Sequence, residues 1–252
     1  MTRIDLNSDL GEGYGLWAMG DDEAMLKLVS SANIACGGHA SDPETMYQTL
    51  LLAAQNGVSI GAHPGYNDPL GFGRRIIPMT PPEISRMVAA QIGSLHAMAL
   101  LAGTRVAYVK PHGALGNLAS DDRAVADAIA MAIKAISPDL AVLAISGTEL
   151  EYAARAAGVT VFSEIFADRG YTPQGRLVPR SQPGAMIHDP NAAVARLLSF
   201  LDSGLMPTVG GDPIRLAAQS ICVHGDSPGA VEMARQIRNR LGAAGVTIAA
   251  FR

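Results

Sequence analysis

The sequence has few cysteines, few aromatic residues and no concentration of positive charge. Cys36 and Cys222 are its only cysteines, which argues against a disulfide scaffold and favours buried, reduced thiols over a disulfide or a nucleophile. Aromatic residues make up 5% of the chain. The net charge is −4 and the lysines and arginines are scattered. Because nucleic-acid binding needs a basic stripe, we expect no nucleic-acid partner.

Long apolar runs are also missing. No apolar run after the first residues approaches the ~20 residues that span a bilayer, and the amino terminus turns acidic without an apolar core. We therefore expect no signal peptide and no membrane segment. The expected location is the cytoplasm, where both thiols would stay reduced.

What the sequence does contain is an alternation of short β-prone runs with longer Ala- and Leu-rich segments of helical period, which is typical of successive βα units and a parallel sheet. The predicted strands are 3–9, 32–37, 58–63, 105–110, 140–145, 159–164 and 219–224. The predicted helices are 43–56, 80–102, 121–136, 148–157, 190–204 and 227–244.

These seven units predict an α/β fold, a distorted seven-stranded parallel (β/α) barrel, and we expect residues 1–252 to form a single domain. An open doubly wound sheet is the alternative, because periodicity does not decide whether a sheet closes. The interval 165–189 is rich in Gly, Pro and Arg and has no apolar period. We expect it to form a loop over the functional site.

Four histidines stand at the ends of predicted strands, where the side chains of parallel strands converge on one face. They are His39, His63, His112 and His224. Such histidines, with a carboxylate, bind a divalent transition metal or act as general acid and base. Each one alone is more often structural, and no HExxH helix is present.

Polar residues alternate along the first predicted strand. Asp5, Asn7 and Asp9 lie two apart and therefore point to one side of a strand, which in a barrel is the interior. Buried there, they would need solvent, a cationic partner or a bound cation. The alternative is that they cap turns. Glu12 follows on the next loop.

Cationic side chains lie at two further strand ends and in the long loop. We expect burial to lower the pKa of Lys110, which suits proton transfer or the binding of an anion, and a salt bridge with an inward aspartate is compatible with this. Arg74, Arg75 and Arg169 lie in glycine-containing loops. Their guanidinium groups suit a substrate carboxylate or phosphate, although exposed surface arginines are the alternative.

The motifs together resemble one known family. They are DLNSDLGEGYG (5–15), SANIACGGHASDP (31–43), GAHPGYNDPLGFGRR (61–75), VKPHGALGN (109–117), FADRGY (166–171), LVPR (177–180) and VHGD (223–226). On these residues the chain is similar to the LamB/YcsF family. The resemblance extends from residue 4 to about residue 226.

The resemblance implies a barrel similar to those of glycoside hydrolases and deacetylases, and ATP-dependent opening of the 5-oxoproline lactam to L-glutamate. It implies 5-oxoprolinase subunits B and C as partners. Since the chain has no GxxxxGK(S/T) loop, we expect the partners to bind the ATP. A homo-oligomer is compatible with the sequence.

The family motifs and the residue chemistry together predict the roles in the site. The expected catalytic residues are Asp9, His39, His63, Lys110 and His112. The expected substrate-binding residues are Asn7, Glu12, Arg74, Glu164, Asp168, Arg169 and His224. If a divalent metal is bound, the expected ligands are Asp9, His39 and His63.

Two positions depart from the family pattern. Gly116 stands where the family usually has Tyr, and Ser41 where it often has Gly. We expect the loss of Tyr to change one wall of the pocket or a partner contact, and with it substrate choice. Two other functions stay open. One is a metal-dependent amidohydrolase or deacetylase that acts alone, and the other is a non-catalytic subunit that binds substrate.

Overall fold

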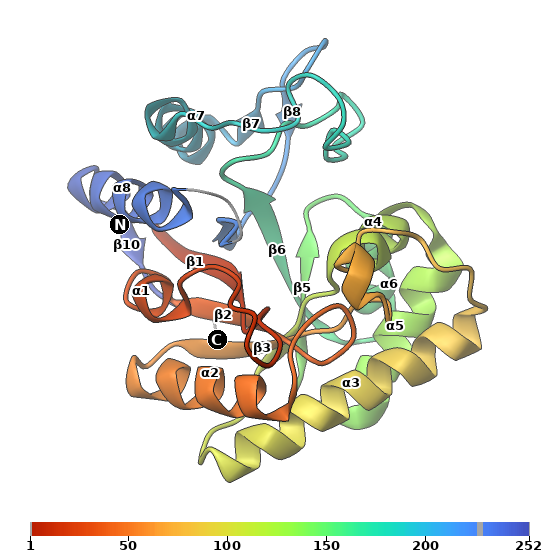
Figure 1. Ribbon diagram of the computed structural model, residues 1–252. Helices are drawn as coiled ribbons and strands as arrows, with labels where there is room; N and C mark the ends of the chain where they lie inside the picture. Colours follow the sequence, from red (N-terminus) through yellow and green to blue (C-terminus); the bar gives the residue numbers. More distant parts are fainter. Residues whose placement is uncertain (1, 226–228, 252) are drawn as a thin grey trace.

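The computed structural model describes residues 2–225 and 229–251, and within them seven parallel strands form a central barrel (Figure 1). The barrel strands are β1 (Arg3–Leu10), β2 (Ser31–Ala35), β3 (Ser59–His63), β4 (Tyr108–Val109), β5 (Ala141–Ile145), β6 (Thr160–Phe166) and β9 (Ser220–Cys222). Each corresponds to a predicted strand. The seven-stranded prediction is therefore confirmed.

The barrel closes because β9 pairs with both β6 and β1. Ser220 lies opposite Asp5 on one side and opposite Glu164 on the other. This register places polar residues of three strands in one layer of the interior. The open doubly wound sheet is therefore wrong.

Helices surround the barrel and lie between the strands. They are α1 (Asp22–Leu26), α2 (Pro43–Gln55), α3 (Pro81–Leu101), α4 (Gly113–Asp121), α5 (Arg123–Ile136), α6 (Glu149–Ala156), α7 (Pro190–Ser203) and α8 (Ala230–Ala243). Their ends follow local chemistry: Asp42 caps α2 ahead of Pro43, and Thr80 and Glu83 form a capping box at α3. α1 and α4 were not predicted from the sequence, because α4 directly follows a strand-end motif and α1 is too short to show a period.

Three short strands lie outside the barrel ring. They are β7 (Leu205–Met206), β8 (Ile214–Arg215) and β10 (Thr247–Ile248), and the 3-10 helix η1 spans Pro69–Gly71. β7 and β8 form an antiparallel pair that lies with α7 beyond the carboxyl end of β6 (Figure 1). β10 extends the pairing of β1 at its first residues. The assignment of the whole chain to one domain stays a prediction.

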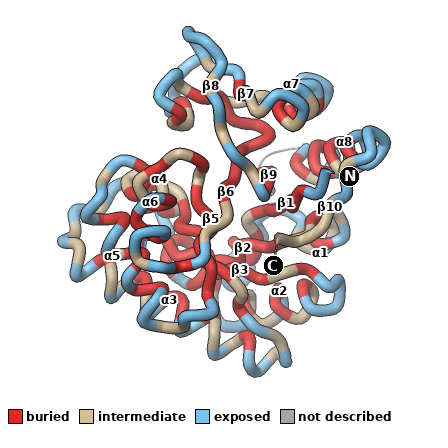
Figure 2. The backbone as a smooth tube through the Cα atoms, turned by 180° about the vertical axis from the view of Figure 1, so that it is seen from behind, coloured by how far each residue is buried: buried red, intermediate tan, exposed pale blue. Residues whose placement is uncertain are grey.

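The core lies between the barrel and the helices. Figure 2 shows buried residues concentrated along the strands and on one side of most helices. Among the described residues, α3 is long and apolar enough to cross a membrane by length and composition, which the sequence analysis did not expect. In the structure α3 packs against α2, α5 and β3 and buries Ile84, Val88, Ile92 and Leu95. These apolar residues therefore form part of the core between the barrel and its helices.

β3 and β4 are in tight contact where Gly61 packs against the ring of Tyr108. A Cβ atom at Gly61 would overlap the ring of Tyr108, which is fully buried and donates a hydrogen bond from its hydroxyl to Asn33. We expect Gly61→Ala to lower the free energy of unfolding by about 1–3 kcal/mol, measured by urea denaturation. The matched control is Gly242→Ala in α8, where nothing lies within 4 Å. This control should raise stability by about 0.5–1 kcal/mol, and equal effects of the two variants would contradict the prediction.

Candidate functional site

A cavity of about 570 Å³ opens among the loops that follow the barrel strands. The predicted site residues on its wall are Asp9, Glu12, His63, Arg74, Lys110, His112, Glu164, Arg169 and His224. Asn7, His39 and Asp168 do not line it, but each hydrogen-bonds a residue that does. Of the predicted interval 165–189, residues 165 and 166 belong to β6 and residues 167–189 form a loop without helix or strand. Arg169, Arg176 and Arg180 of this loop line the cavity. The prediction of a loop over the site is confirmed.

The floor of the cavity is the polar interior of the barrel. The Asp5 carboxylate accepts hydrogen bonds from the hydroxyl groups of Ser30 and Ser31, at 2.6 and 2.7 Å, and from Ser220. The Asn7 amide donates to Ser220 at 2.7 Å. The inward orientation predicted for β1 is confirmed, and these side chains have hydrogen-bonding partners and do not cap turns.

Lys110 is the buried cation of the floor. Its Nζ atom lies 3.2 Å from Asp9 Oδ1, Glu164 Oε2 and Asn7 Oδ1, and 3.1 Å from Cys222 Sγ. Burial lowers the pKa of Lys110, but Asp9, Cys222 and Glu164 outweigh burial and hold the pKa well above its ordinary value. The expectation of a lowered pKa is therefore wrong. The sequence shows that the lysine is buried, but it does not show the two carboxylates around it.

The pKa values of the two carboxyl groups beside Lys110 are shifted in opposite directions. Burial raises the pKa of Asp9, but His63 and Lys110 outweigh it, so the pKa lies well below its ordinary value. Burial also raises the pKa of Glu164, and there the attraction of Lys110 does not compensate. The floor therefore keeps an ammonium group and an ionised Asp9 together at neutral pH.

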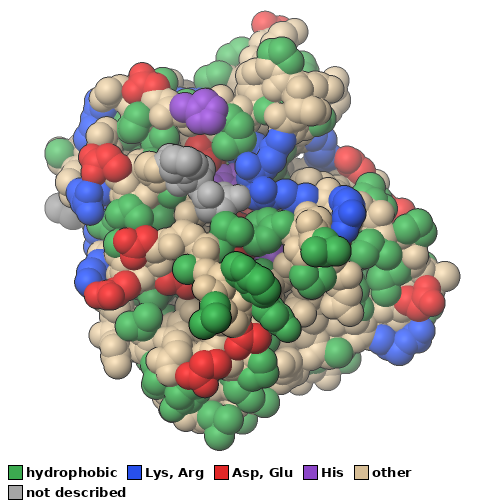
Figure 3. Space-filling model, viewed as in Figure 1, with side chains coloured by type: hydrophobic (Ala, Val, Ile, Leu, Met, Phe, Trp, Pro, Cys, Tyr) green, Lys and Arg blue, Asp and Glu red, His purple; other side chains and the backbone are tan. Residues whose placement is uncertain are grey.

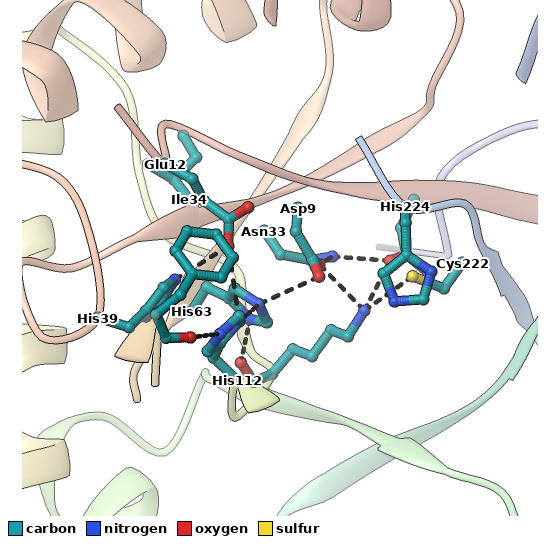
Figure 4. A network of polar contacts seen from close by, with 12 residues as sticks. Asp9, Glu12, Asn33, Ile34, His39, His63, His112, Cys222 and His224 are labelled. Carbon is teal, nitrogen blue, oxygen red and sulfur yellow. Dashed lines mark hydrogen bonds and ion pairs between the residues drawn. The ribbon is translucent and has the colours of Figure 1, made fainter. Parts of the chain in front are cut away.

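Beside Asp9 lies a cluster of three histidines and one glutamate, which we call the histidine cluster (Figure 4). It contains Glu12, His39, His63 and His112, and one ligand atom from each lies within 4.8 Å of the others. The rings of His39 and His112 stack at 3.6 Å. Burial lowers the pKa of His39 well below its ordinary value and that of His112 to about 3, with neighbouring histidines adding to both shifts. Of the three predicted metal ligands, the cluster contains His39 and His63, whereas Asp9 contacts it through His63 Nε2 at 3.3 Å.

His224 lies on the side of Asp9 away from the histidine cluster (Figure 4). It forms a pair with Asp168. His224 Nδ1 lies 2.8 and 2.9 Å from the two carboxylate oxygens. Burial raises the pKa of Asp168, but His224 outweighs it and the pKa falls below its ordinary value. The carboxylate thus orients the imidazole, and Nε2 is the nitrogen left for the cavity that His224 lines.

Arginines line the upper wall of the cavity. Two different loops supply these arginines, which are Arg74, Arg169 and Arg180. Figure 3 shows Lys and Arg side chains gathered below the upper part of the molecule, which contains α7, β7 and β8 in Figure 1. Burial, with the charge of Arg180 next, lowers the pKa of Arg169 to about 10. Arg75 points elsewhere and pairs with Asp68. The wall is therefore cationic and suited to an anionic ligand.

Several polar residues of the site were not singled out from the sequence. Asn33 donates to both Asn7 and Asp9, at 2.7 and 2.8 Å. Arg180 stood in the LVPR motif without an assigned role, and no local pattern marks it. Ser220 and Cys222 alternate on β9, so the period of two could have placed them together in the interior.

The prediction of buried thiols is confirmed. Cys36 and Cys222 are both free and buried, and burial raises the pKa of Cys36 to about 12 and that of Cys222 well above its ordinary value. A thiol with a raised pKa is a poor nucleophile at neutral pH.

The two departures from the family pattern have different settings. Gly116 lies on α4 and lines the cavity, so a larger side chain in relatives would change this wall. Ser41 has φ 77°, a left-handed conformation that glycine adopts without strain. Asp226, the last residue of the VHGD motif, lies outside the described residues.

Comparison with known proteins agrees with these motifs. Residues 4–252 match the LamB/YcsF family. A protein of Azorhizobium caulinodans, named as the A subunit of 5-oxoprolinase, is 54% identical over 251 residues, covering 100% of this chain and 99% of the relative. The crystal structure of a lactam utilization protein from Thermus thermophilus superposes with a TM-score of 0.94 at 43% identity, covering 99% of this chain and 100% of that one.

A more distant structure shares the fold alone. It is the T48 deacetylase with substrate, at 12% identity and a TM-score of 0.50, covering 98% of this chain and 87% of that one. The predicted likeness to deacetylase barrels is confirmed at the level of the fold. From the match over residues 4–252 and the 54% identity across the whole chain, the chain belongs to the LamB/YcsF family.

Proposed function

We propose that this chain is the A subunit of an ATP-dependent 5-oxoprolinase, a hydrolase that opens the lactam of 5-oxoproline to L-glutamate. The observation that carries the proposal is the 54% identity, over the whole chain, to a relative of that name. The cavity supports it, because a cationic wall and a buried ammonium suit a small anionic amide.

We further propose that subunits B and C bind the ATP and that the complex works in the cytoplasm. The sequence of this chain carries no GxxxxGK(S/T) loop, the loop that usually cradles the phosphates of ATP. A division of labour follows, in which the partners activate the lactam and this barrel carries out the hydrolysis.

The chemistry needs activation because amide resonance makes the lactam carbon a poor electrophile. Transfer of the γ-phosphoryl group of ATP to the lactam oxygen gives ADP and a ring C=N bond, with loss of the N–H proton. A water then adds to this carbon, the ring C–N bond breaks and the nitrogen takes up protons, which leaves an acyl phosphate. A second water hydrolyses the acyl phosphate to the carboxylate of glutamate and inorganic phosphate.

The residues of the cavity take distinct roles in this scheme. Arg74, Arg169 and Arg180 hold the substrate carboxylate and the phosphoryl group. Lys110 stabilises negative charge that develops on oxygen, as a permanent cation rather than a proton donor.

Protons are moved by two of the three imidazole groups that line the cavity. His63 and Asp9 lie together, with His63 Nε2 3.3 Å from the carboxylate, and they assist the attack of water. His224, oriented by Asp168, donates a proton to the leaving ring nitrogen.

The experiment that tests the function measures glutamate release from 5-oxoproline. It uses this chain alone and with subunits B and C, each with and without ATP. The proposal expects release only in the complete mixture with ATP. Release with subunits B and C alone, unaffected by this chain, would contradict it.

One observation favours a second function, an ATP-independent amide hydrolase or deacetylase. Three members of the histidine cluster, Glu12, His63 and His112, line the cavity with Asp9 beside them. A divalent metal ion held there would activate water without phosphorylation. Turnover of a small amide by this chain alone, without ATP, would favour this alternative over the oxoprolinase.

A further inference from the structure

We propose that the histidine cluster is a binding site for one divalent transition-metal ion, held by His63 Nε2, His112 Nδ1 and the Glu12 carboxylate. His39 positions Glu12 and is not itself a ligand in this assignment. The proposal keeps one of the three ligands expected from the sequence. With the ion bound, His63 Nε2 is a ligand, and the ion replaces His63 in the proposed function by assisting the attack of water beside Asp9. The test measures binding and does not depend on which reaction the protein catalyses.

Backbone carbonyl groups fix the positions of the hydrogen atoms on the His63 and His112 rings. His63 Nδ1 lies 2.6 Å from the Lys110 carbonyl oxygen, and His112 Nε2 lies 2.8 Å from the Phe72 carbonyl oxygen. A carbonyl oxygen only accepts, so both of these ring nitrogens carry the hydrogen. In the neutral rings, His63 Nε2 and His112 Nδ1 therefore both carry lone pairs.

Those two lone pairs face one another. His63 Nε2 and His112 Nδ1 are 3.0 Å apart. Glu12 Oε1 lies 3.5 Å from His112 Nδ1, and Asp9 Oδ2 lies 3.3 Å from His63 Nε2. Acceptor atoms that converge in this way need a positive group between them. A proton on one of the rings or a divalent cation supplies it, and only the cation bonds to both nitrogens at once.

The spacing of the atoms fits coordination. Metal–ligand bonds of about 2.0–2.2 Å place neighbouring ligand atoms about 3.0–3.5 Å apart. The distances His63–His112 and His112–Glu12, 3.0 and 3.5 Å, fall in this range. All three ligand residues line the cavity, so an ion held by them would be open to the cavity, as in catalytic metal sites.

The surroundings hold the ligands in place. The carbonyl groups of Lys110 and Phe72 fix the two tautomers, an arrangement common among metal-binding histidines. His39 Nε2 lies 3.0 Å from Glu12 Oε1, while its Nδ1 is buried without a partner. Donation from Nε2 to Glu12 leaves only a lone pair unsatisfied on Nδ1, whereas metal ligation through Nε2 would bury an unpaired N–H. His39 is therefore the positioning residue.

Two glycines allow this close packing. A Cβ atom at Gly65 would lie 2.8 Å from His39 Nδ1, and one at Gly73 would lie 2.7 Å from the His39 Cβ and 2.9 Å from the His112 ring. Both positions border the stacked imidazoles. Any larger residue at these two positions would displace the imidazole rings.

The donor atoms select the class of ion. Two imidazole nitrogens and one carboxylate suit Zn²⁺, Co²⁺, Fe²⁺ or Mn²⁺, whereas Mg²⁺ prefers an all-oxygen shell. An ion at this place would act as a Lewis acid toward the substrate oxygen or the attacking water.

The test titrates the full chain, after treatment with a chelator, with Co²⁺ and Zn²⁺. Binding is followed by calorimetry and by the visible absorption of Co²⁺, which reports nitrogen ligation. We expect one ion per chain, and a Kd at least ~100-fold weaker in His63→Gln and in His112→Gln. His39→Gln should weaken binding by about 10-fold, as expected for a residue that only holds a ligand.

The matched control is His188→Asn, at an exposed histidine in the loop before α7, which should leave the Kd unchanged. Circular dichroism checks the fold of every variant, and Glu12→Gln, which keeps the side-chain volume, is used if a histidine variant does not fold. The absence of saturable Co²⁺ and Zn²⁺ binding by the wild-type chain would overturn the proposal. So would wild-type affinity in folded His63→Gln and His112→Gln.

Discussion

Replacing Lys110 with methionine is expected to lower kcat for glutamate release by at least ~10²–10³-fold in the complex with subunits B and C. The ammonium group is 3.2 Å from both Asp9 and Glu164 and, since its pKa is raised, it stays charged at every pH below its ordinary value of 10.5. Methionine preserves much of the length and loses the charge, so developing negative charge on oxygen would face two carboxylates without a cation.

The same substitution should also lower stability, by about 3–5 kcal/mol, because it leaves buried carboxylates without their partner. Urea denaturation measures the loss of stability, and steady-state kinetics measures the loss of kcat. The double variant Lys110→Met/Asp9→Asn separates the two losses, since it is expected to restore much of the stability but not the activity. Lys27→Met, at a surface lysine paired with Glu23, is the control and should change neither. A folded Lys110→Met protein with wild-type kcat would contradict the role of Lys110.

His224→Gln is expected to lower kcat by about 10²–10⁴-fold, the usual contribution of a positioned general acid. Asp168→Asn should have an effect of similar size. The asparagine amide would donate to Nδ1, so the hydrogen would move to Nε2 and the tautomer in the cavity would change.

The pair should behave as one unit. The double variant His224→Gln/Asp168→Asn is expected to be about as slow as the slower single variant, because residues that act together are not additive. Steady-state kinetics of the complex checks this. Fully additive losses would show that the two residues do not form an acid pair. His188→Asn is again the control.

Local patterns predicted much of the fold. The period of two along β1 placed Asp5, Asn7 and Asp9 on one face, and in the structure all three point into the barrel interior and have hydrogen-bonding partners, with Asp9 at the cavity wall. Strand periodicity works here because it depends only on the alternation of side chains along one segment. The short strands β7 and β8 were missed because two residues do not establish a period.

The composition of the site could be predicted better than its electrostatics. The motifs marked His63, Lys110, His112 and His224, and all four line one cavity. The pKa of Lys110 could not be predicted, because it depends on carboxylates from β1 and β6, which are 101 and 54 positions away in the sequence. Coulomb interactions depend on distance in space and not on distance along the chain.

The difference between two neighbouring arginines shows the same limit. Arg74 and Arg75 are equivalent in the sequence, yet Arg74 lines the cavity and Arg75 pairs with Asp68. The path of the loop after η1 decides this, and its residues have no repeating pattern from which the path can be inferred.

The sequence by itself determined the seven βα units, the strand-end histidines and the family, since these properties are local or lie in contiguous motifs. Only the tertiary structure decided that β9 closes the barrel against β1, that Lys110 stays charged, and that backbone carbonyl groups turn two imidazole lone pairs toward each other. The physical reason is that closure, pKa values and tautomers depend on contacts between segments that are distant along the chain.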